Sequence, residues 1–121
     1  MRMKCLDTYA LVEIHNGNPT FANLLNEEPV ITDITFAEFY AHLYRKYEAK
    51  TADYWERRLG FFCQPVPREI LLRAVRFRID HKKQDLSFFD CVGYLFAVSN
   101  GMTFVTGDKE FKDAPHVEFL G

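Results

Sequence analysis

Four acidic residues are the side chains of this 121-residue chain with the clearest capacity for chemistry. Asp7 and Asp108 each follow a predicted strand, and Glu38 and Asp90 fall in the first turns of two predicted helices. Carboxylates gathered at one place repel one another and raise each other's pKa, and a divalent cation relieves that repulsion. Ligands that are all oxygen suit Mg²⁺ or Mn²⁺. If the four acids converge, the pattern predicts a hard-metal site.

The elements that must position these acids alternate along the chain. Strands are predicted over residues 3–6, 29–32, 61–63, 103–106 and 116–119, and helices over residues 9–14, 20–25, 35–47, 51–59, 68–80 and 86–98. Such alternation predicts an α/β fold with a mainly parallel five-stranded sheet flanked by helices. In a parallel sheet the strands end, and the next helices begin, at one rim, so the four acids can meet there.

Composition and charge narrow the class of protein. The length fits one domain over residues 1–121, and 48% hydrophobic with 16% aromatic residues excludes disorder. A net charge of −2 does not mark an obvious polyanion binder. Cys5, Cys63 and Cys91 show no paired spacing and are predicted to be buried free thiols. The longest apolar stretch, residues 86–98, is too short to span a membrane, so we expect a soluble, cytoplasmic protein.

Each acid also has a purely structural explanation. Glu38 stands three residues after Thr35, and Asp90 stands three residues after Ser87, and each spacing fits a helix capping box. Asp7 and Asp108 are residue types that form turns. Taken one at a time, these explanations compete evenly with metal binding.

Asp90 is the hardest of the four to explain structurally. Its predicted helix is apolar on every face, so the carboxylate is expected to be at least partly buried. No Arg or Lys lies between Lys83 and Lys109 to pair with it locally. Because a buried carboxylate without a partner costs several kcal/mol, Asp90 needs an ion pair or a metal ion.

Four segments together resemble the PIN-domain nuclease family, and look most like the small VapC-type toxins of prokaryotic toxin–antitoxin pairs. The segments are Cys5-Leu6-Asp7-Thr8, residues 32–39, residues 86–91 and residues 104–111. The resemblance covers essentially the whole chain and implies a parallel sheet between helices. The position after Asp7-Thr8 is often Asn or Ser in that family and here is Tyr9, which puts one supporting hydrogen bond in doubt.

The resemblance implies a function and the residues that perform it. It implies endonucleolytic hydrolysis of RNA with Mg²⁺ or Mn²⁺, leaving a 5′-phosphate and a 3′-hydroxyl. It also implies a homodimer and an antitoxin chain that inhibits the enzyme by filling its active-site groove. The residues it assigns to catalysis and metal binding are Asp7, Glu38, Asp90 and Asp108, supported by Thr8 and by Thr106, which would orient Asp108 or a water.

Basic and aromatic residues point to partners. Residues 68–83 hold six basic residues against two acidic ones. This favours contact with the RNA backbone through Arg73, Arg76, Lys82 and Lys83, with an ordinary solvated helix face as the alternative. Aromatic residues crowd residues 39–55, where any that the core leaves exposed would suit an antitoxin or a second copy of the chain.

Other acidic α/β proteins fit less well. A phosphotransfer receiver domain needs an Asp after its third strand, and a haloacid-dehalogenase-type phosphatase needs two Asp residues flanking one position after the first strand; neither pattern is present. Two alternatives stay open on the same fold: a nuclease of RNA maturation or quality control, and a binding module for RNA or protein without catalysis. The sequence does not identify the RNA target or the number of metal ions.

Overall fold

Strands and helices alternate along residues 2–121, the part of the chain that the computed structural model describes. The strands are β1 (Lys4–Leu6), β2 (Ile31–Thr32), β3 (Cys63–Gln64), β4 (Thr103–Thr106) and β5 (Val117–Phe119). The helices are α1 (Thr8–His15), α2 (Pro19–Ala22), α3 (Asp33–Lys46), α4 (Ala49–Leu59), α5 (Arg68–Asp80) and α6 (Phe88–Ser99). Three short 3₁₀ turns complete the fold: η1 (Asn23–Glu27), η2 (Gly60–Phe62) and η3 (Lys109–Phe111).

Strand pairing among the described residues is parallel throughout. One sheet has the order β1-β4-β5, and β2 pairs with β3 in a second, two-stranded sheet. A single bridge between Cys5 and Val30, just before β2, joins the two sheets, and there the Leu6 N–H donates to the Val30 carbonyl at 3.0 Å. The predicted α/β fold with five parallel strands is confirmed, and the strands divide between two sheets at this short junction.

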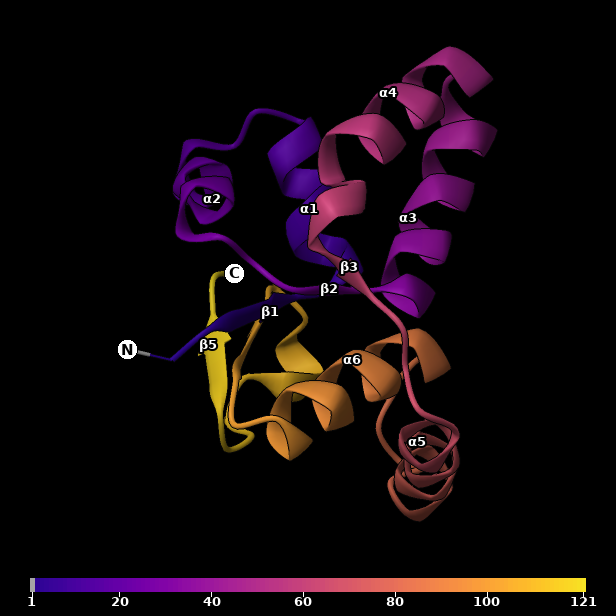
Figure 1. The fold of residues 1–121 in the computed structure, drawn as a ribbon. Coiled ribbons are helices and arrows are strands. Elements are labelled where there is room, and N and C mark those ends of the chain that lie inside the picture. The colour runs from indigo at the N-terminus through magenta and orange to yellow at the C-terminus, as the bar shows by residue number, and fades with distance from the viewer. Residues whose placement is uncertain (1) are drawn as a thin grey trace.

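Helices cover both faces of the strands (Figure 1). The α1, α3 and α4 helices lie on one side, and α5 and α6 lie on the other. Side chains alternate along each strand. Cys5 and Phe104 therefore enter the core beneath α5 and α6, whereas Leu6 and Val105 enter the core shared with α1, α3 and α4. The strands end between these two cores, at the positions of the candidate acids.

The helix that carries Asp90 lies unusually close to the sheet. A Cβ atom built at Gly93 would stand 2.9 Å from the Phe104 ring, which is closer than side chains tolerate. The absence of a side chain at Gly93 therefore lets α6 approach β4. At the start of α6 the Ser87 hydroxyl accepts a hydrogen bond from the Asp90 N–H at 3.0 Å, which confirms the predicted cap.

The structure corrects the start of the helix that carries Glu38. This helix begins at Asp33 rather than Thr35, and Thr32 is its N-cap, with its hydroxyl accepting from the Thr35 N–H at 3.0 Å. Thr32 ends β2 in extended backbone, which is the conformation that an N-cap requires. Glu38 consequently lies in the second turn, so the prediction of a capping box from Thr35 to Glu38 is wrong.

Smaller differences follow from local backbone geometry. The helix predicted from Thr51 begins at Ala49, and residues 61–62, predicted as strand, belong to η2 because Gly60 continues the preceding helix into a tight turn. Cys5 and Cys91 are buried free thiols as predicted, and Cys63 is half-buried. No helix within residues 2–121 combines the length and apolarity needed to cross a membrane.

Candidate active site

Asp7 is built into the fold by three of its atoms. Its N–H donates to the Val105 carbonyl at 3.1 Å, which ties the end of β1 to β4. Its Oδ1 accepts from the Ala10 N–H at 2.8 Å and caps α1. The side chain is 1% exposed, and its Oδ2 is the one fully buried side-chain polar atom among the described residues that lacks a hydrogen-bond partner. An orphaned carboxylate oxygen in a core is costly and calls for a ligand.

The environment of Asp7 strongly disfavours its charged form. Burial is the largest cause that raises the pKa of this carboxyl, and the charges of Asp90 and Asp108 raise it as well. The Thr106 hydroxyl and the Ala10 N–H lower it, and the resulting pKa is about 8. Asp7 therefore lies close enough to Asp90 and Asp108, two other acids of the predicted set, for their charges to affect its pKa.

Asp90 completes the acidic cluster from the first turn of α6. Burial first, and then the charges of Glu38 and Asp108, raise the pKa of its half-buried carboxyl to about 7. Asp7, Glu38, Asp90 and Asp108 are therefore brought together, as the sequence predicts, although they come from four separate segments. Carboxylates that are both buried and close to one another are typical of sites that bind a cation.

Two threonines hold the remaining pair of acids. The Thr8 hydroxyl donates to Glu38 Oε1. The Thr106 hydroxyl accepts from the Asp108 N–H at 3.0 Å, and Asp108 Oδ1 in turn accepts from the Glu110 N–H at 3.0 Å. These contacts place Thr8 and Thr106 where the sequence predicted supporting residues, with Thr106 acting on the Asp108 backbone.

Asp90 and Asp108 open onto a surface pocket of about 410 Å³. Its remaining lining residues are Tyr9, Asp85, Gly107, Lys109 and Glu110. Sequence reasoning did not identify Asp85, Lys109 or Glu110 as lining residues. They are exposed polar residues with no distinctive spacing, so only the fold reveals that they border the acids.

The donor set fits a hard divalent ion. Within residues 2–121 no group of three or more His, Cys, Asp or Glu side chains has the arrangement of a formed metal site. The orphaned oxygen of Asp7 and the mutual repulsion of Asp7, Asp90 and Asp108 are nevertheless the features that a cation would relieve. Because the four candidate ligands are carboxylates, Mg²⁺ or Mn²⁺ suits them better than zinc.

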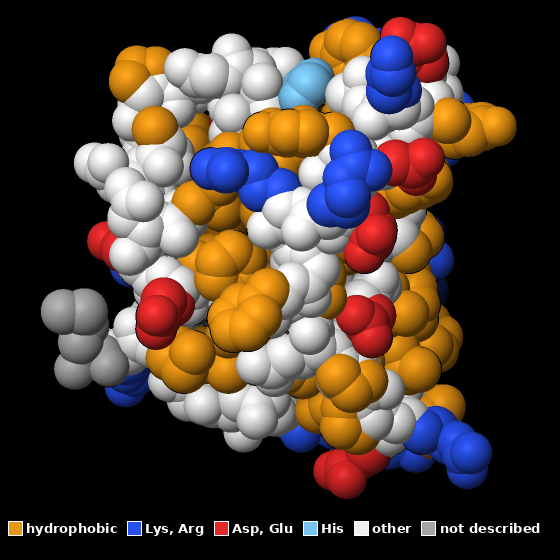
Figure 2. All heavy atoms as spheres, turned by 45° about the horizontal axis from the view of Figure 1, so that its top comes forward, with side chains coloured by type: hydrophobic (Ala, Val, Ile, Leu, Met, Phe, Trp, Pro, Cys, Tyr) orange, Lys and Arg blue, Asp and Glu red, His pale blue; other side chains and the backbone are white. Residues whose placement is uncertain are grey.

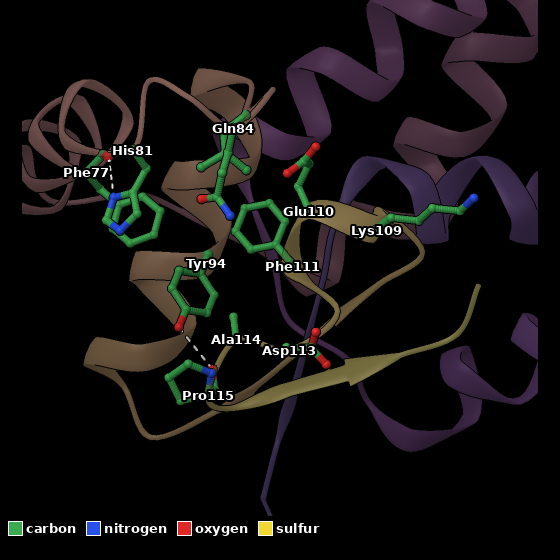
Figure 3. A pocket seen from close by; sticks show the side chains of 11 residues that line it. Phe77, His81, Gln84, Tyr94, Lys109, Glu110, Phe111, Asp113, Ala114 and Pro115 are labelled. Atoms are coloured by element: carbon green, nitrogen blue, oxygen red, sulfur yellow. Dashed lines mark hydrogen bonds between the residues drawn. The ribbon is translucent and has the colours of Figure 1, made fainter.

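A second pocket lies on the other side of η3 and contains none of the four acids (Figure 3). It measures about 500 Å³, and Phe77, Tyr94 and Phe111 form its aromatic walls. It shares Lys109 and Glu110 with the acidic pocket. Polar side chains, among them His81, Gln84 and Asp113, line this pocket beside the aromatic ones.

The four predicted RNA-binding residues are all exposed but do not lie together at the acids. Lys82, followed by Lys83, lines a small pocket with Asp85, which also borders the acidic pocket. Arg73 instead donates to the Ser99 hydroxyl at 3.0 Å. Ser99 is nine residues beyond Asp90, so it lies about 14 Å away along α6. Arg76 lies one turn beyond Arg73 on α5, in the middle of the helix.

Comparison with known proteins identifies the family. The model of the PIN domain matches residues 4–117, so the chain belongs to the PIN-domain family. A sequence comparison with curated proteins gives no significant match.

Solved structures share the fold at low sequence identity. A toxin–antitoxin complex from Klebsiella pneumoniae has a TM-score of 0.76 at 20% identity, covering 95% of each chain. VapC20 from Mycobacterium tuberculosis, described as a sarcin–ricin loop cleaving toxin, has a TM-score of 0.76 at 19% identity, covering 97% of this chain and 96% of that one. VapBC2 from Rickettsia felis, bound to a promoter DNA fragment, has a TM-score of 0.78 at 19% identity, covering 98% and 99%.

The first prediction concerns stability without metal. Between pH 4 and pH 8 folded Asp7 keeps a proton that the unfolded chain releases, so wild-type stability should fall as pH rises through this window. Asp7→Asn removes that loss while an amide oxygen still caps α1. In EDTA, urea unfolding should show the variant and wild type alike near pH 4, with the variant more stable by a few kcal/mol near pH 8.

The exposed carboxylate of Asp113 supplies the matched control. Asp113→Asn should leave the pH dependence of unfolding unchanged. A gap between Asp7→Asn and wild type that is the same at pH 4 and pH 8 would show that the pKa of Asp7 is not raised in the folded protein.

Proposed function

We propose that this chain is a metal-dependent endoribonuclease, formed by residues 1–121 as one domain. The observation that carries the proposal is the convergence of four carboxylates from the ends of β1 and β4 and from α3 and α6, with one buried oxygen of Asp7 lacking a partner. Within the described residues, no histidine or cysteine lines the pocket onto which Asp90 and Asp108 open. We assign Asp7, Glu38, Asp90 and Asp108 as the catalytic metal ligands.

The residues prepare the site for a cation before it binds. Mg²⁺ or Mn²⁺, when bound there, would activate a water and offset the charge that develops on the phosphate. Thr8 orients Glu38, and Thr106 orients the backbone of Asp108, so two ligands are positioned in advance. The Ala10 N–H fixes the other oxygen of Asp7 and leaves Oδ2 as the free donor.

RNA is the substrate that the comparisons favour. One structural neighbour is described as a toxin that cleaves the sarcin–ricin loop, and others are toxin–antitoxin complexes. We infer that this chain is the toxin of a VapBC-type pair, acting on RNA in the cytoplasm. Family membership supports nuclease activity, and the acidic site supports hydrolysis of a phosphodiester bond.

The second prediction tests catalysis. Wild-type protein should cleave a mixed RNA pool with Mn²⁺ or Mg²⁺ and should not cleave it in EDTA. Asp90→Asn should reduce the cleavage rate at least about a hundredfold, because it removes one charged ligand from the cluster. Gel analysis of the RNA measures the rate, and end-mapping should find 5′-phosphate and 3′-hydroxyl ends.

Asp113→Asn serves again as control and should cleave at the wild-type rate. Circular dichroism should show that Asp90→Asn remains folded. If Asp90→Asn cleaves as fast as wild type, the assignment of the metal ligands is wrong. If folded wild-type protein, free of any co-purified inhibitor, cleaves no RNA with either metal, the chain is a binding module.

We propose that Lys82 and Lys83 contact the RNA backbone beside the acids, and that Arg73 and Arg76 extend the contact along α5. Lys82 is the best placed, because the pocket that it lines meets the acidic pocket at Asp85. Positive charge here would offset the repulsion between the acids and RNA phosphates.

The third prediction is a change in salt dependence. Replacing Lys82 and Lys83 together by Ala should weaken RNA binding, and the slope of log affinity against log salt should flatten by about 0.7 for each lost phosphate contact. Anisotropy of a labelled single-stranded RNA measures both quantities. The matched control replaces Arg57 and Arg58, an exposed basic pair on α4. An equal loss of RNA affinity in both double variants would show that only the net charge of the protein matters and that Lys82 and Lys83 make no specific contact.

We propose that the aromatic surface on α3 and α4 binds the antitoxin. Tyr44, Tyr47 and Tyr54 are exposed there, and hydrophobic side chains gather along this side of the molecule (Figure 2). The Tyr40 hydroxyl donates to Asp53 Oδ1 at 2.7 Å and ties the two helices together. A firm, aromatic surface of this kind suits an apolar segment of a partner chain.

We propose that a second copy of the chain packs on α5. Leu72, Val75 and Ile79 are exposed at spacings of three and four residues, so they form one apolar stripe along that helix. This stripe lies on a different helix from the aromatic surface. The two partners can therefore bind at the same time.

The fourth prediction separates these two surfaces. Light scattering should give the mass of a dimer for wild type and of a monomer for Ile79→Glu, because the charge would be buried in the interface. Tyr44→Glu should remain dimeric but should lose co-purification with a co-expressed antitoxin encoded beside it. A monomeric wild type, or an Ile79→Glu variant that stays dimeric, would exclude the α5 interface.

A further inference from the structure

Tyr9 is an aromatic side chain at the edge of an acidic pocket. It lines the pocket with Asp90 and Asp108, yet 41% of it stays exposed. Aromatic rings usually bury most of their surface in a core. The exposed face of the Tyr9 ring is therefore available to bind a ligand beside these carboxylates.

The position of the Tyr9 ring is closely defined by its neighbours. A Cβ atom built on Gly107 would lie 2.1 Å from Tyr9 Cε1, so the ring rests directly on the Gly107 backbone. The Phe21 ring is a second neighbour, with ring centroids 6.0 Å apart and an interplanar angle of 48°. Tyr9 also follows Thr8 at the start of α1, which Asp7 caps. The same residues that place the acids thus place the ring.

We propose that Tyr9 is a stacking platform for a nucleobase of the RNA strand, next to the phosphate that is cleaved. The inference rests on the proposed ribonuclease function and adds to it a subsite for one base. Single-stranded RNA is bound by stacking its exposed bases on aromatic side chains. A base and its phosphate are covalently joined, so a ring that borders the phosphate site is well placed to receive the base.

The chemistry of the pocket disfavours an acidic peptide as the partner of the Tyr9 ring. Asp85, Asp90, Asp108 and Glu110 line the same pocket and would repel it. A nucleobase is flat and uncharged, and it brings no repulsion of its own. Because every base has a π-face, stacking on Tyr9 would position the strand with little preference for sequence.

Two simpler roles for Tyr9 make different predictions. If the ring only covers Gly107, its removal should affect stability and leave cleavage unchanged. If its hydroxyl binds the phosphate or a water, Tyr9→Phe should be as impaired as a variant without any ring. Stacking requires the ring and not the hydroxyl.

The experiment compares three variants on two substrates. Tyr9→Phe keeps the ring, Tyr9→Leu keeps apolar bulk without an aromatic face, and Tyr9→Ser removes both. The substrates are an RNA oligonucleotide that wild type cleaves and the same oligonucleotide with an abasic nucleotide on one or the other side of the cleaved bond. The measured quantities are kcat and KM, with thermal melting to check the fold of each variant.

Wild type should lose about 10- to 100-fold in kcat/KM on one of the two abasic substrates, the range expected for one base stacked on an aromatic ring. Tyr9→Leu and Tyr9→Ser should show a similar loss on intact RNA and little further loss on that abasic substrate. Tyr9→Phe should resemble wild type on both. The abasic comparison uses wild-type protein, so it holds even if a variant folds poorly.

Each other outcome overturns the inference in a recognisable way. If Tyr9→Leu equals wild type on intact RNA, or wild type ignores both abasic sites, the base does not stack on Tyr9 while the nuclease function stands. If Tyr9→Phe is as slow as Tyr9→Leu, the hydroxyl acts instead of the ring. If wild type shows no metal-dependent cleavage of RNA, the proposed function fails and the stacking subsite fails with it.

Discussion

The burial of the Asp7 carboxylate is the constraint on which the rest of the site depends. Its backbone joins β1 to β4, and its Oδ1 caps α1, so the fold cannot easily move this residue to water. The carboxylate is thereby held in the core with Oδ2 unpaired. A structure that needed only stability would place an apolar or amide side chain here. Keeping the acid lowers stability but provides an oxygen donor that is already in position.

The other three acids are held in place by different interactions. Asp90 is half-buried in the first turn of α6, where the positive end of the helix dipole favours negative charge. Glu38 and Asp108 are held by Thr8 and Thr106 through single hydrogen bonds, without a countercharge. No basic side chain contacts the four carboxylates in a salt bridge within residues 2–121. The cluster is held in place by hydroxyl and backbone groups, which leaves its negative charge available to a cation.

Sequence patterns anticipated the parts of this arrangement that depend on local signals. Ser87 was a predicted cap and caps α6, and the strand over residues 103–106 was predicted to the residue. The start of α3 was missed because both Thr32 and Thr35 are acceptable cap residues, and only the position where β2 ends selects Thr32. The contact of Tyr9 with Gly107 was not foreseen, since it joins residues 98 positions apart with no periodicity to reveal it.

The features that the sequence predicted and those it missed differ in how the fold positions them. Asp7 and Asp108 follow β1 and β4, and Glu38 and Asp90 lie in the early turns of α3 and α6, so their positions depend on the backbone of these strands and helices. This explains how solved structures with about 20% identity can have the same fold. Side chains on the rim, such as Tyr9 and Lys82, have no backbone role and are free to differ. Under the proposed function, the acids would act on the phosphodiester bond, and the rim would hold the strand beside them.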